Sequence, residues 1–211
     1  MAPEPRRAPA PRRPERGVRA LRARSGHGRL LPALALCVLL AAAAPARANE
    51  AALHFTVDLA RKELRVELRT AARGPRGETH TEAGPRFRVA TGTPHHPTPR
   101  GTFALEQWVA NPRFQPGPEA RRRGARPVAA STDGPLGIAK IPFQGAHELH
   151  GGAHRYALGK PVTLGCVQLT NGQMRELGHW LDTHGLLARA EATPSGELRR
   201  RFLRAATLVI E

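Results

Sequence analysis

The sequence is poor in aromatic residues. Phenylalanine, tryptophan and tyrosine together make up 4% of its 211 residues, too few to build a stacking surface of the kind that binds single-stranded nucleic acid. The arginines are scattered along the chain rather than gathered on one helical face. A formal net charge of +16 therefore does not indicate nucleic-acid binding, and we expect no nucleic-acid partner.

Half of this positive charge belongs to the first 48 residues. They hold ten arginines and two glutamates, which gives +8, and the other 23 basic and 15 acidic residues give the remaining +8. A domain with a charge of +8 attracts anionic surfaces over long distances. A cell wall rich in carboxylates is the anionic partner that we expect.

The sequence also lacks an apolar run long enough to span a membrane. The longest run covers residues 30–44, fewer than the ~20 residues that a spanning helix needs. An arginine-rich segment precedes this run, and Ala46-Arg47-Ala48 follows it, which is the pattern of a secretory signal peptide. We therefore predict a signal peptide over residues 1–48 and a single domain over residues 49–211. The domain is expected in the periplasm or cell wall, without membrane attachment.

Cysteine is scarce as well, and removal of the signal peptide would leave one. Cys37 lies in the apolar run, so Cys166 would remain without a partner for an internal disulfide. Such a thiol is reactive, pairs with another chain, or is a buried structural residue. Cys166 directly follows Gly165, and His150 precedes it by 16 positions. An imidazole can convert a thiol into a nucleophile, and a glycine leaves backbone N–H groups open to an oxyanion. We interpret this pair as a cysteine–histidine acyl-transfer site.

A cluster of histidines allows an alternative, a metal site. His147, His150 and His154 are spaced by three and four residues, which on one helical face would suit zinc. However, Gly151 and Gly152 disfavour a helix at this point. The His-Glu-x-x-His motif is also missing, because the two histidines that flank Glu148 are one residue too close. We therefore predict no metal.

Much of the remaining sequence alternates between apolar and polar residues, as half-buried strands do. We predict strands over residues 53–59, 63–68, 87–92, 102–109, 136–143 and 206–210, and loops over residues 73–86, 111–127 and 191–197. After Cys166 the apolar spacing changes to three and four residues, which predicts one main helix capped by Asn171 and ended at Gly185. Many short strands and one helix indicate a mostly β domain, a sandwich or a barrel.

The order of these features resembles the catalytic domain of the L,D-transpeptidase family, the YkuD type. That pattern contains His-Gly, a loop, Ser/Thr-x-Gly-Cys, an apolar residue and a nearby Asn. The similar residues here are His150-Gly151, Thr163-Leu164-Gly165-Cys166, Val167 and Asn171. The resemblance covers about residues 53–190. Two positions differ, because Leu164 stands where the family often has His and Gln168 where it usually has Arg.

The resemblance implies an L,D-transpeptidase-like β-sandwich or barrel whose main helix follows the catalytic cysteine. Cys166 would be the nucleophile that takes an acyl group from a peptidoglycan tetrapeptide stem, and His150 the general base and acid. The Gly165 N–H would hold the oxyanion, and the Gly151 carbonyl would orient the imidazole. No cofactor is implied. The residues expected to bind substrate are Thr163, Gln168, Asn171 and Tyr156.

The expected function is cell-wall biogenesis. The thioester at Cys166 would pass to an amine, either of a second stem peptide in a 3-3 cross-link or of a lysine on an outer-membrane lipoprotein. Two alternatives stay open. Water as the acceptor would make the protein an L,D-carboxypeptidase, and loss of turnover would leave a wall-binding module. The second alternative draws support from Gln168, which lacks the charge of arginine.

Overall fold

The computed structural model describes residues 51–71 and 79–211, which form a mostly β domain. Its elements, in chain order, are β1 Ala52–Asp58, β2 Glu63–Ala71, β3 Thr79–Arg88, β4 Thr91–Gly92, β5 Gly101–Ala110, α1 Pro118–Arg122, β6 Ala139–Gln144, β7 His147–His150, the 3-10 helix η1 Arg155–Ala157, β8 Pro161–Thr163, β9 Val167–Gln168, α2 Asn171–Thr183, β10 Glu191–Ala192 and β11 Leu198–Ile210. The predicted class, mostly β with one main helix after the cysteine, is confirmed.

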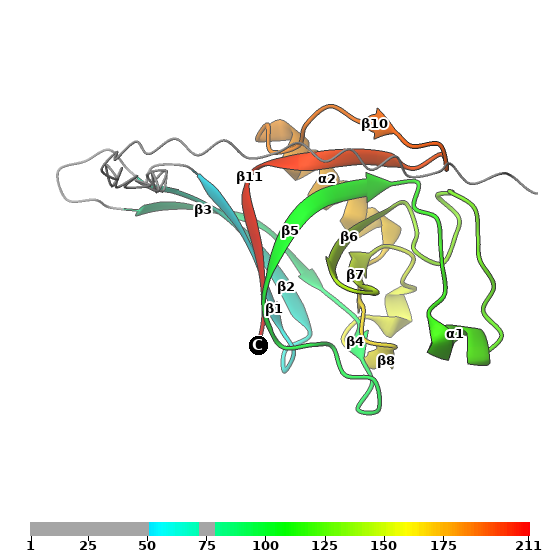
Figure 1. Ribbon diagram of the computed structural model, residues 1–211. Helices are drawn as coiled ribbons and strands as arrows, with labels where there is room; N and C mark the ends of the chain where they lie inside the picture. The colour runs from blue at the N-terminus through cyan, green and yellow to red at the C-terminus, as the bar shows by residue number, and fades with distance from the viewer. Residues whose placement is uncertain (1–50, 72–78) are drawn as a thin grey trace, which may run out of the picture. The chain divides into compact units, whose positions relative to one another are not determined.

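Nine of these strands form one curled sheet (Figure 1). Eight follow the order β3-β2-β1-β11-β5-β6-β7-β9, while β10 pairs with β11. The terminal strand β11 runs parallel to β1 and antiparallel to β5. It therefore joins the opening hairpin of the domain to β7, which carries the histidine, and to β9, which directly follows the cysteine.

The alternation that predicts the first strands matches their burial. Leu53, Phe55 and Val57 of β1 are fully buried, and Phe55 pairs with Val66 of β2 on one side and Leu208 of β11 on the other. Residues directly opposite one another project from the same face of a sheet. These buried residues of β1 and their partners on β2 and β11 therefore form the core side of the sheet.

Two strands, β3 and β10, lie partly or wholly in segments for which the sequence predicts loops, and β11 begins earlier than predicted. β3 begins at Thr79, although the predicted loop covers residues 73–86, of which 73–78 lie outside the described residues. β3 is an edge strand whose first residues are exposed, so its sequence stays polar, and Pro85 lies at a register shift, where proline is tolerated. β11 begins at Leu198 rather than at Ala206, because its arginine-rich first part pairs with β5 and is not buried.

The main helix α2 covers the core with one apolar face. Met174, Leu177 and Leu181 are fully buried. The helix is capped by Thr170 rather than by Asn171, because the Thr170 hydroxyl accepts from the Gln173 N–H at 3.1 Å while the Gln173 side chain accepts from the Thr170 N–H at 2.8 Å. This reciprocal capping box makes Asn171 the first residue of the helix.

Within the described ranges, no helix is long and apolar enough to cross a bilayer.

Candidate active site

A row of residues in register crosses five strands and leads to the predicted catalytic pair. Its members, from β11 through β5, β6 and β7 to β9, are Arg199, Val109, Lys140, His150 and Gln168. Because each is directly opposite the next, their side chains project from one face of the sheet. All of them line a cavity of about 760 Å³ that Cys166 also lines. The strand register thus places His150 and Gln168 beside the cysteine and Arg199 on the far side of the cavity.

The loop before β9 is held in shape by Thr163. The Thr163 hydroxyl accepts a hydrogen bond from the Gly165 N–H at 3.1 Å and donates one to the Cys166 carbonyl oxygen at 2.6 Å. Gly165 has φ +111°, and a Cβ at this position would lie 2.6 Å from Nε2 of His147. Glycine is required here for its backbone conformation and for the space that the His147 ring occupies.

This bracing distinguishes the two backbone N–H groups that could hold an oxyanion. The Gly165 N–H already donates to Thr163. The Cys166 N–H has no hydrogen-bond partner within residues 51–71 and 79–211. The Cys166 N–H is therefore the more available donor, whereas the use of the Gly165 N–H stays a prediction.

The imidazole of His150 is buried and has a defined tautomer. Its Nδ1 lies 2.8 Å from the Gly151 carbonyl oxygen. A carbonyl oxygen can only accept, so Nδ1 carries the proton and Nε2 keeps a free lone pair. Burial lowers the pKa of His150 to about 4. The ring is therefore neutral at pH 7, as a general base must be.

The thiol of Cys166 is neutral in this resting geometry. Burial raises its pKa to about 11, and Sγ donates to the carbonyl oxygen of Ala146 at 3.8 Å. In the part of the chain that the structure describes, no hydrogen bond joins the thiol to His150. Catalytic hydrogen bonds often tighten only when substrate is bound. A nucleophilic attack at this site would require proton removal during the reaction rather than a preformed thiolate.

Asn171 braces the site from outside the cavity. Its Oδ1 accepts from the Ile138 N–H at 3.1 Å and from the Gly152 N–H at 3.0 Å. A Cβ at Gly137, which has φ +65°, would lie 2.1 Å from this oxygen. The side chain thus ties the start of β6 to the turn after His150. Asn171 is not among the described residues that line the cavity, and its expected contact with substrate stays a prediction.

Tyr156 is likewise outside the cavity lining as the described residues define it. Its side chain is 72% exposed, and its ring stacks on His154 at a centroid distance of 5.3 Å. His147 and His150 lie on strand β7 rather than on a helix. Among residues 51–71 and 79–211, no group of three potential metal ligands converges.

Two groups of ion-paired residues on the cavity wall were not predicted from the sequence. Nζ of Lys140 lies 2.8 Å from Oε1 of Glu148, and both side chains are mostly buried. Burial raises the pKa of Glu148, against the opposing effect of Lys140. Lys140 stands between the buried residues Ala139 and Ile141, so alternation places it on the other face of β6. The sequence does not reveal that this face lines a cavity.

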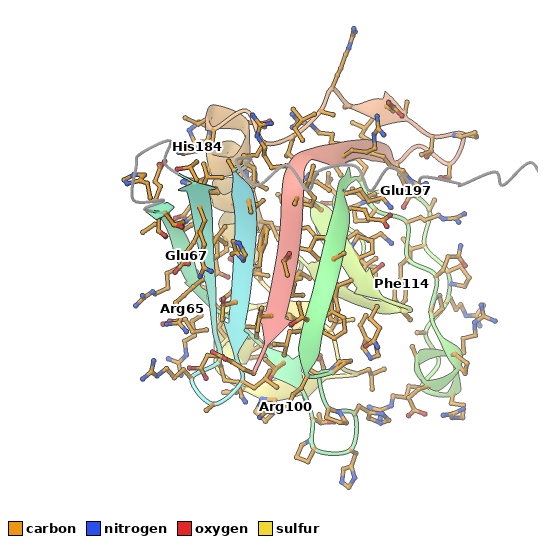
Figure 2. All side chains as sticks on the ribbon, turned by 60° about the vertical axis from the view of Figure 1, so that its left-hand side comes forward. Arg65, Glu67, Arg100, Phe114, His184 and Glu197 are labelled. Carbon is orange, nitrogen blue, oxygen red and sulfur yellow. The ribbon has the colours of Figure 1, made fainter. Side chains whose placement is uncertain are left out.

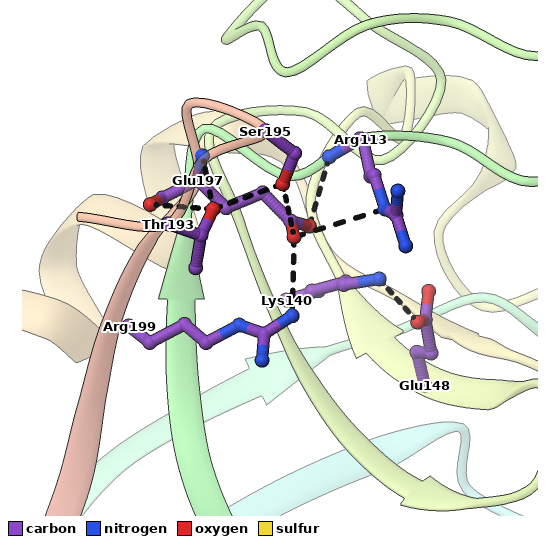
Figure 3. Close-up of polar contacts among 7 residues, drawn as sticks. All are labelled: Arg113, Lys140, Glu148, Thr193, Ser195, Glu197 and Arg199. Carbon is purple, nitrogen blue, oxygen red and sulfur yellow. Dashed lines mark hydrogen bonds and ion pairs between the residues drawn. The ribbon is translucent and has the colours of Figure 1, made fainter. Parts of the chain in front are cut away.

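The second is a cluster around Glu197, which lies where β5 ends and β11 begins (Figure 2). Glu197 is 2% exposed; it accepts from the Arg113 N–H at 3.1 Å and from Nη2 of Arg199 at 3.3 Å (Figure 3). Burial alone would raise the pKa of Glu197, but these donors hold it below its usual value. The carboxylate is therefore ionised inside the wall.

The domain is thus a curled β sheet whose single cavity-lining cysteine shares that cavity with a buried, oriented histidine. Residues 57–196 match the model of the YkuD family, the L,D-transpeptidase catalytic domain. The match covers well over half of the chain, and the chain belongs to this family of enzymes. A search of curated proteins gave no match.

Solved structures of L,D-transpeptidases are similar at low identity. An L,D-transpeptidase from Mycobacterium smegmatis is 16% identical with a TM-score of 0.43, over 76% of this chain and 59% of that one. L,D-transpeptidase 3 from Mycobacterium tuberculosis, bound to a faropenem-derived adduct, is 14% identical with a TM-score of 0.45, over 76% and 60%. The catalytic domain of the Enterococcus faecium enzyme is 13% identical with a TM-score of 0.44, over 75% and 96%. The chain thus spans about three fifths of the length of the two mycobacterial proteins.

Proposed function

We propose that the protein is a peptidoglycan L,D-transpeptidase that forms a thioester at Cys166 from a tetrapeptide stem and transfers the acyl group to an amine. One observation carries this proposal. The hydrogen bond from Nδ1 of His150 to the Gly151 carbonyl oxygen leaves Nε2 as a neutral acceptor, in the cavity that Cys166 lines. A buried histidine with this tautomer is suited to take a thiol proton.

In the first half of the reaction, Nε2 of His150 takes the proton from Sγ of Cys166 as Sγ attacks the carbonyl carbon of the diamino acid. The oxyanion forms beside the N–H of Cys166, with the Gly165 N–H as a second donor if its bond to Thr163 is released. The C–N bond to the terminal residue then breaks. The proton passes from His150 to the departing amine, and a thioester remains on Cys166.

In the second half, an acceptor amine attacks the thioester and His150 takes its proton. Collapse of the tetrahedral intermediate forms the new amide, and the Cys166 sulfur recovers a proton from His150. An amine from a second stem peptide gives a 3-3 cross-link, and a lysine amine attaches a lipoprotein. Water in place of the amine gives a carboxypeptidase, the second candidate. Its support is that Cys166 lines a cavity of about 760 Å³, which has room for water as well as for an amine.

We also propose that the protein acts after export, in the periplasm or cell wall. The arginine-rich segment, the apolar run and Ala46-Arg47-Ala48 support cleavage before Asn49. N-terminal sequencing of the exported protein tests this proposal. A mature chain that starts within residues 1–40 contradicts it.

Acylation by a carbapenem tests the nucleophile. Intact mass should rise by one ligand, and the adduct should map to the peptide that holds Cys166. Cys166→Ala should give no adduct. His150→Ala should react more slowly by about 10²–10⁴-fold, the usual contribution of a general base. An unchanged mass of the folded wild-type protein would refute the enzyme proposal, leaving the wall-binding module. Equal rates with and without His150 would refute its assignment as the base.

A second assay identifies the acceptor. Purified tetrapeptide muropeptides are incubated with the protein, and the products are separated by mass. Cross-linked dimers are expected from a transpeptidase. Tripeptides alone would show that water is the acceptor and would favour the carboxypeptidase.

A further inference from the structure

The cavity wall opposite the cysteine carries two arginines with unused hydrogen-bond donors. Arg113 and Arg199 line the cavity, and their side chains are 48% and 47% exposed. Each guanidinium has five N–H donors. Within the described residues, the guanidinium of Arg199 donates one hydrogen bond, to Glu197, and that of Arg113 makes only an ion pair with Glu197 at 3.8 Å. Most of their donors are therefore available to a ligand.

Glu197 fixes these arginines without exposing its own charge. Its buried carboxylate also accepts from the Ser195 hydroxyl at 3.3 Å (Figure 3). The other carboxylates on the wall have partners of their own, because Glu148 pairs with Lys140 at 2.8 Å and Glu119 with Arg123 at 2.9 Å. The groups that the cavity offers to a ligand at this side are therefore mainly cationic.

The distance along the row indicates which part of a peptide could reach these arginines. Arg199 and His150 are separated by three strand spacings, or about 14 Å between backbones at ~4.8 Å per spacing. The carboxylate of the departing terminal residue lies only about one residue, ~3.5 Å, beyond the attacked carbonyl. A carboxylate at the end of a long side chain reaches farther and can meet an arginine that extends from the opposite wall.

We propose that Arg113 and Arg199 form the subsite for the free carboxylate at the end of the diamino acid side chain in the donor stem peptide. The inference rests on the proposed function and names the group that the cavity selects. Arginine binds carboxylates through two parallel N–H···O bonds, which lysine and glutamine cannot reproduce. Gln168 on β9 carries no charge. The two arginines instead supply a permanent positive charge, one from β11 and the other from the segment after β5.

Equilibrium binding to the Cys166→Ala protein tests this subsite without turnover. Three tetrapeptides are compared by calorimetry: one with both carboxylates free, one with the side-chain carboxylate converted to an amide, and one with the terminal carboxylate converted to an amide. The side-chain amide should bind about tenfold to a hundredfold more weakly than the free peptide, as expected for loss of a charge-assisted hydrogen bond. The terminal amide should bind nearly as well as the free peptide.

The same comparison is made after Arg199→Gln and Arg113→Gln are added to the Cys166→Ala protein. Each should reduce the preference for the free side-chain carboxylate, and Arg199→Lys should restore it only in part. Arg175→Gln is the control, because it removes one positive charge from the exposed face of α2, outside the cavity lining. The preference is a ratio of affinities within one variant, so partial unfolding of that variant does not change it.

An undiminished preference in both glutamine variants would overturn the subsite. So would a preference that depends on the terminal carboxylate, because the arginines would then bind the departing residue. Turnover by the wild-type protein is measured in parallel to separate the two proposals. Selective binding without turnover rejects the enzyme and keeps the subsite, whereas turnover without arginine-dependent selectivity rejects the subsite and keeps the enzyme.

Discussion

The clearest structural prediction concerns Asn171, whose side chain should stabilise the site through two hydrogen bonds to backbone N–H groups. In Asn171→Ala, the N–H groups of Ile138 and Gly152 lose their common acceptor. A typical hydrogen bond contributes about 1 kcal/mol to stability. The free energy of unfolding should therefore fall by about 2 kcal/mol, and by more if the partly buried Ile138 N–H finds no water.

Asn171→Asp is the matched control, because a carboxylate oxygen can accept both hydrogen bonds and is favourable in the first turn of a helix. Urea unfolding at pH 7 measures both variants, with an unchanged m value required for the comparison. The carbapenem acylation rate should fall in Asn171→Ala, since Gly152 follows the residue whose carbonyl orients His150, and should be retained in Asn171→Asp. A midpoint for Asn171→Ala equal to wild type, or an equal loss in both variants, would refute this account of the brace.

Three further predictions follow from the burial and capping of individual groups. Alkylation of Cys166 by iodoacetamide should rise with pH through about 11, and an inflection near the ordinary value of 9.0 would show that the thiol is not desolvated. The folded pKa of His150 is lowered from 6.5 to about 4. The stability that comes from keeping this imidazole neutral is therefore complete above pH 6.5 and is lost as the pH falls from 6.5 to 4. At ~1.36 kcal/mol per pH unit, the free energy of unfolding should fall by roughly 3 kcal/mol over this range. The urea midpoint should fall less over this pH range in His150→Gln than in the wild-type protein. An equal fall in both proteins would show that protonation of His150 does not cause the loss. Thr170→Ala should lower the free energy of unfolding by about 1 kcal/mol through loss of the helix cap, whereas Thr170→Ser should retain it; equal midpoints of the alanine variant and wild type would show that the cap is not stabilising.

Local patterns were sufficient for the class of fold and for the main elements. The alternation of Leu53, Phe55 and Val57 predicts β1, because a strand with one buried face needs apolar residues at every second position. The spacing of Met174, Leu177 and Leu181 predicts α2 for the corresponding reason in a helix. Local patterns failed where burial is slight. The exposed residues of β3 form a strand through pairing with the preceding strand β2, and the arginines of β11 through pairing with the distant strand β5. Neither pairing is contained in the pattern of the segment itself.

The sequence alone determined the types of residue at the candidate site. These are one thiol, one histidine, and a glycine next to each of them in the chain. The family match over residues 57–196 agrees with that order of motifs. Tertiary structure alone decided which neighbours these residues have. Strand register brings Arg199 and Lys140 into the row of His150, and chain reversal places Asn171 against residues 33 positions earlier. Register depends on which strands pair and how their turns close, so contacts between residues far apart in sequence become visible only when the sheet is complete.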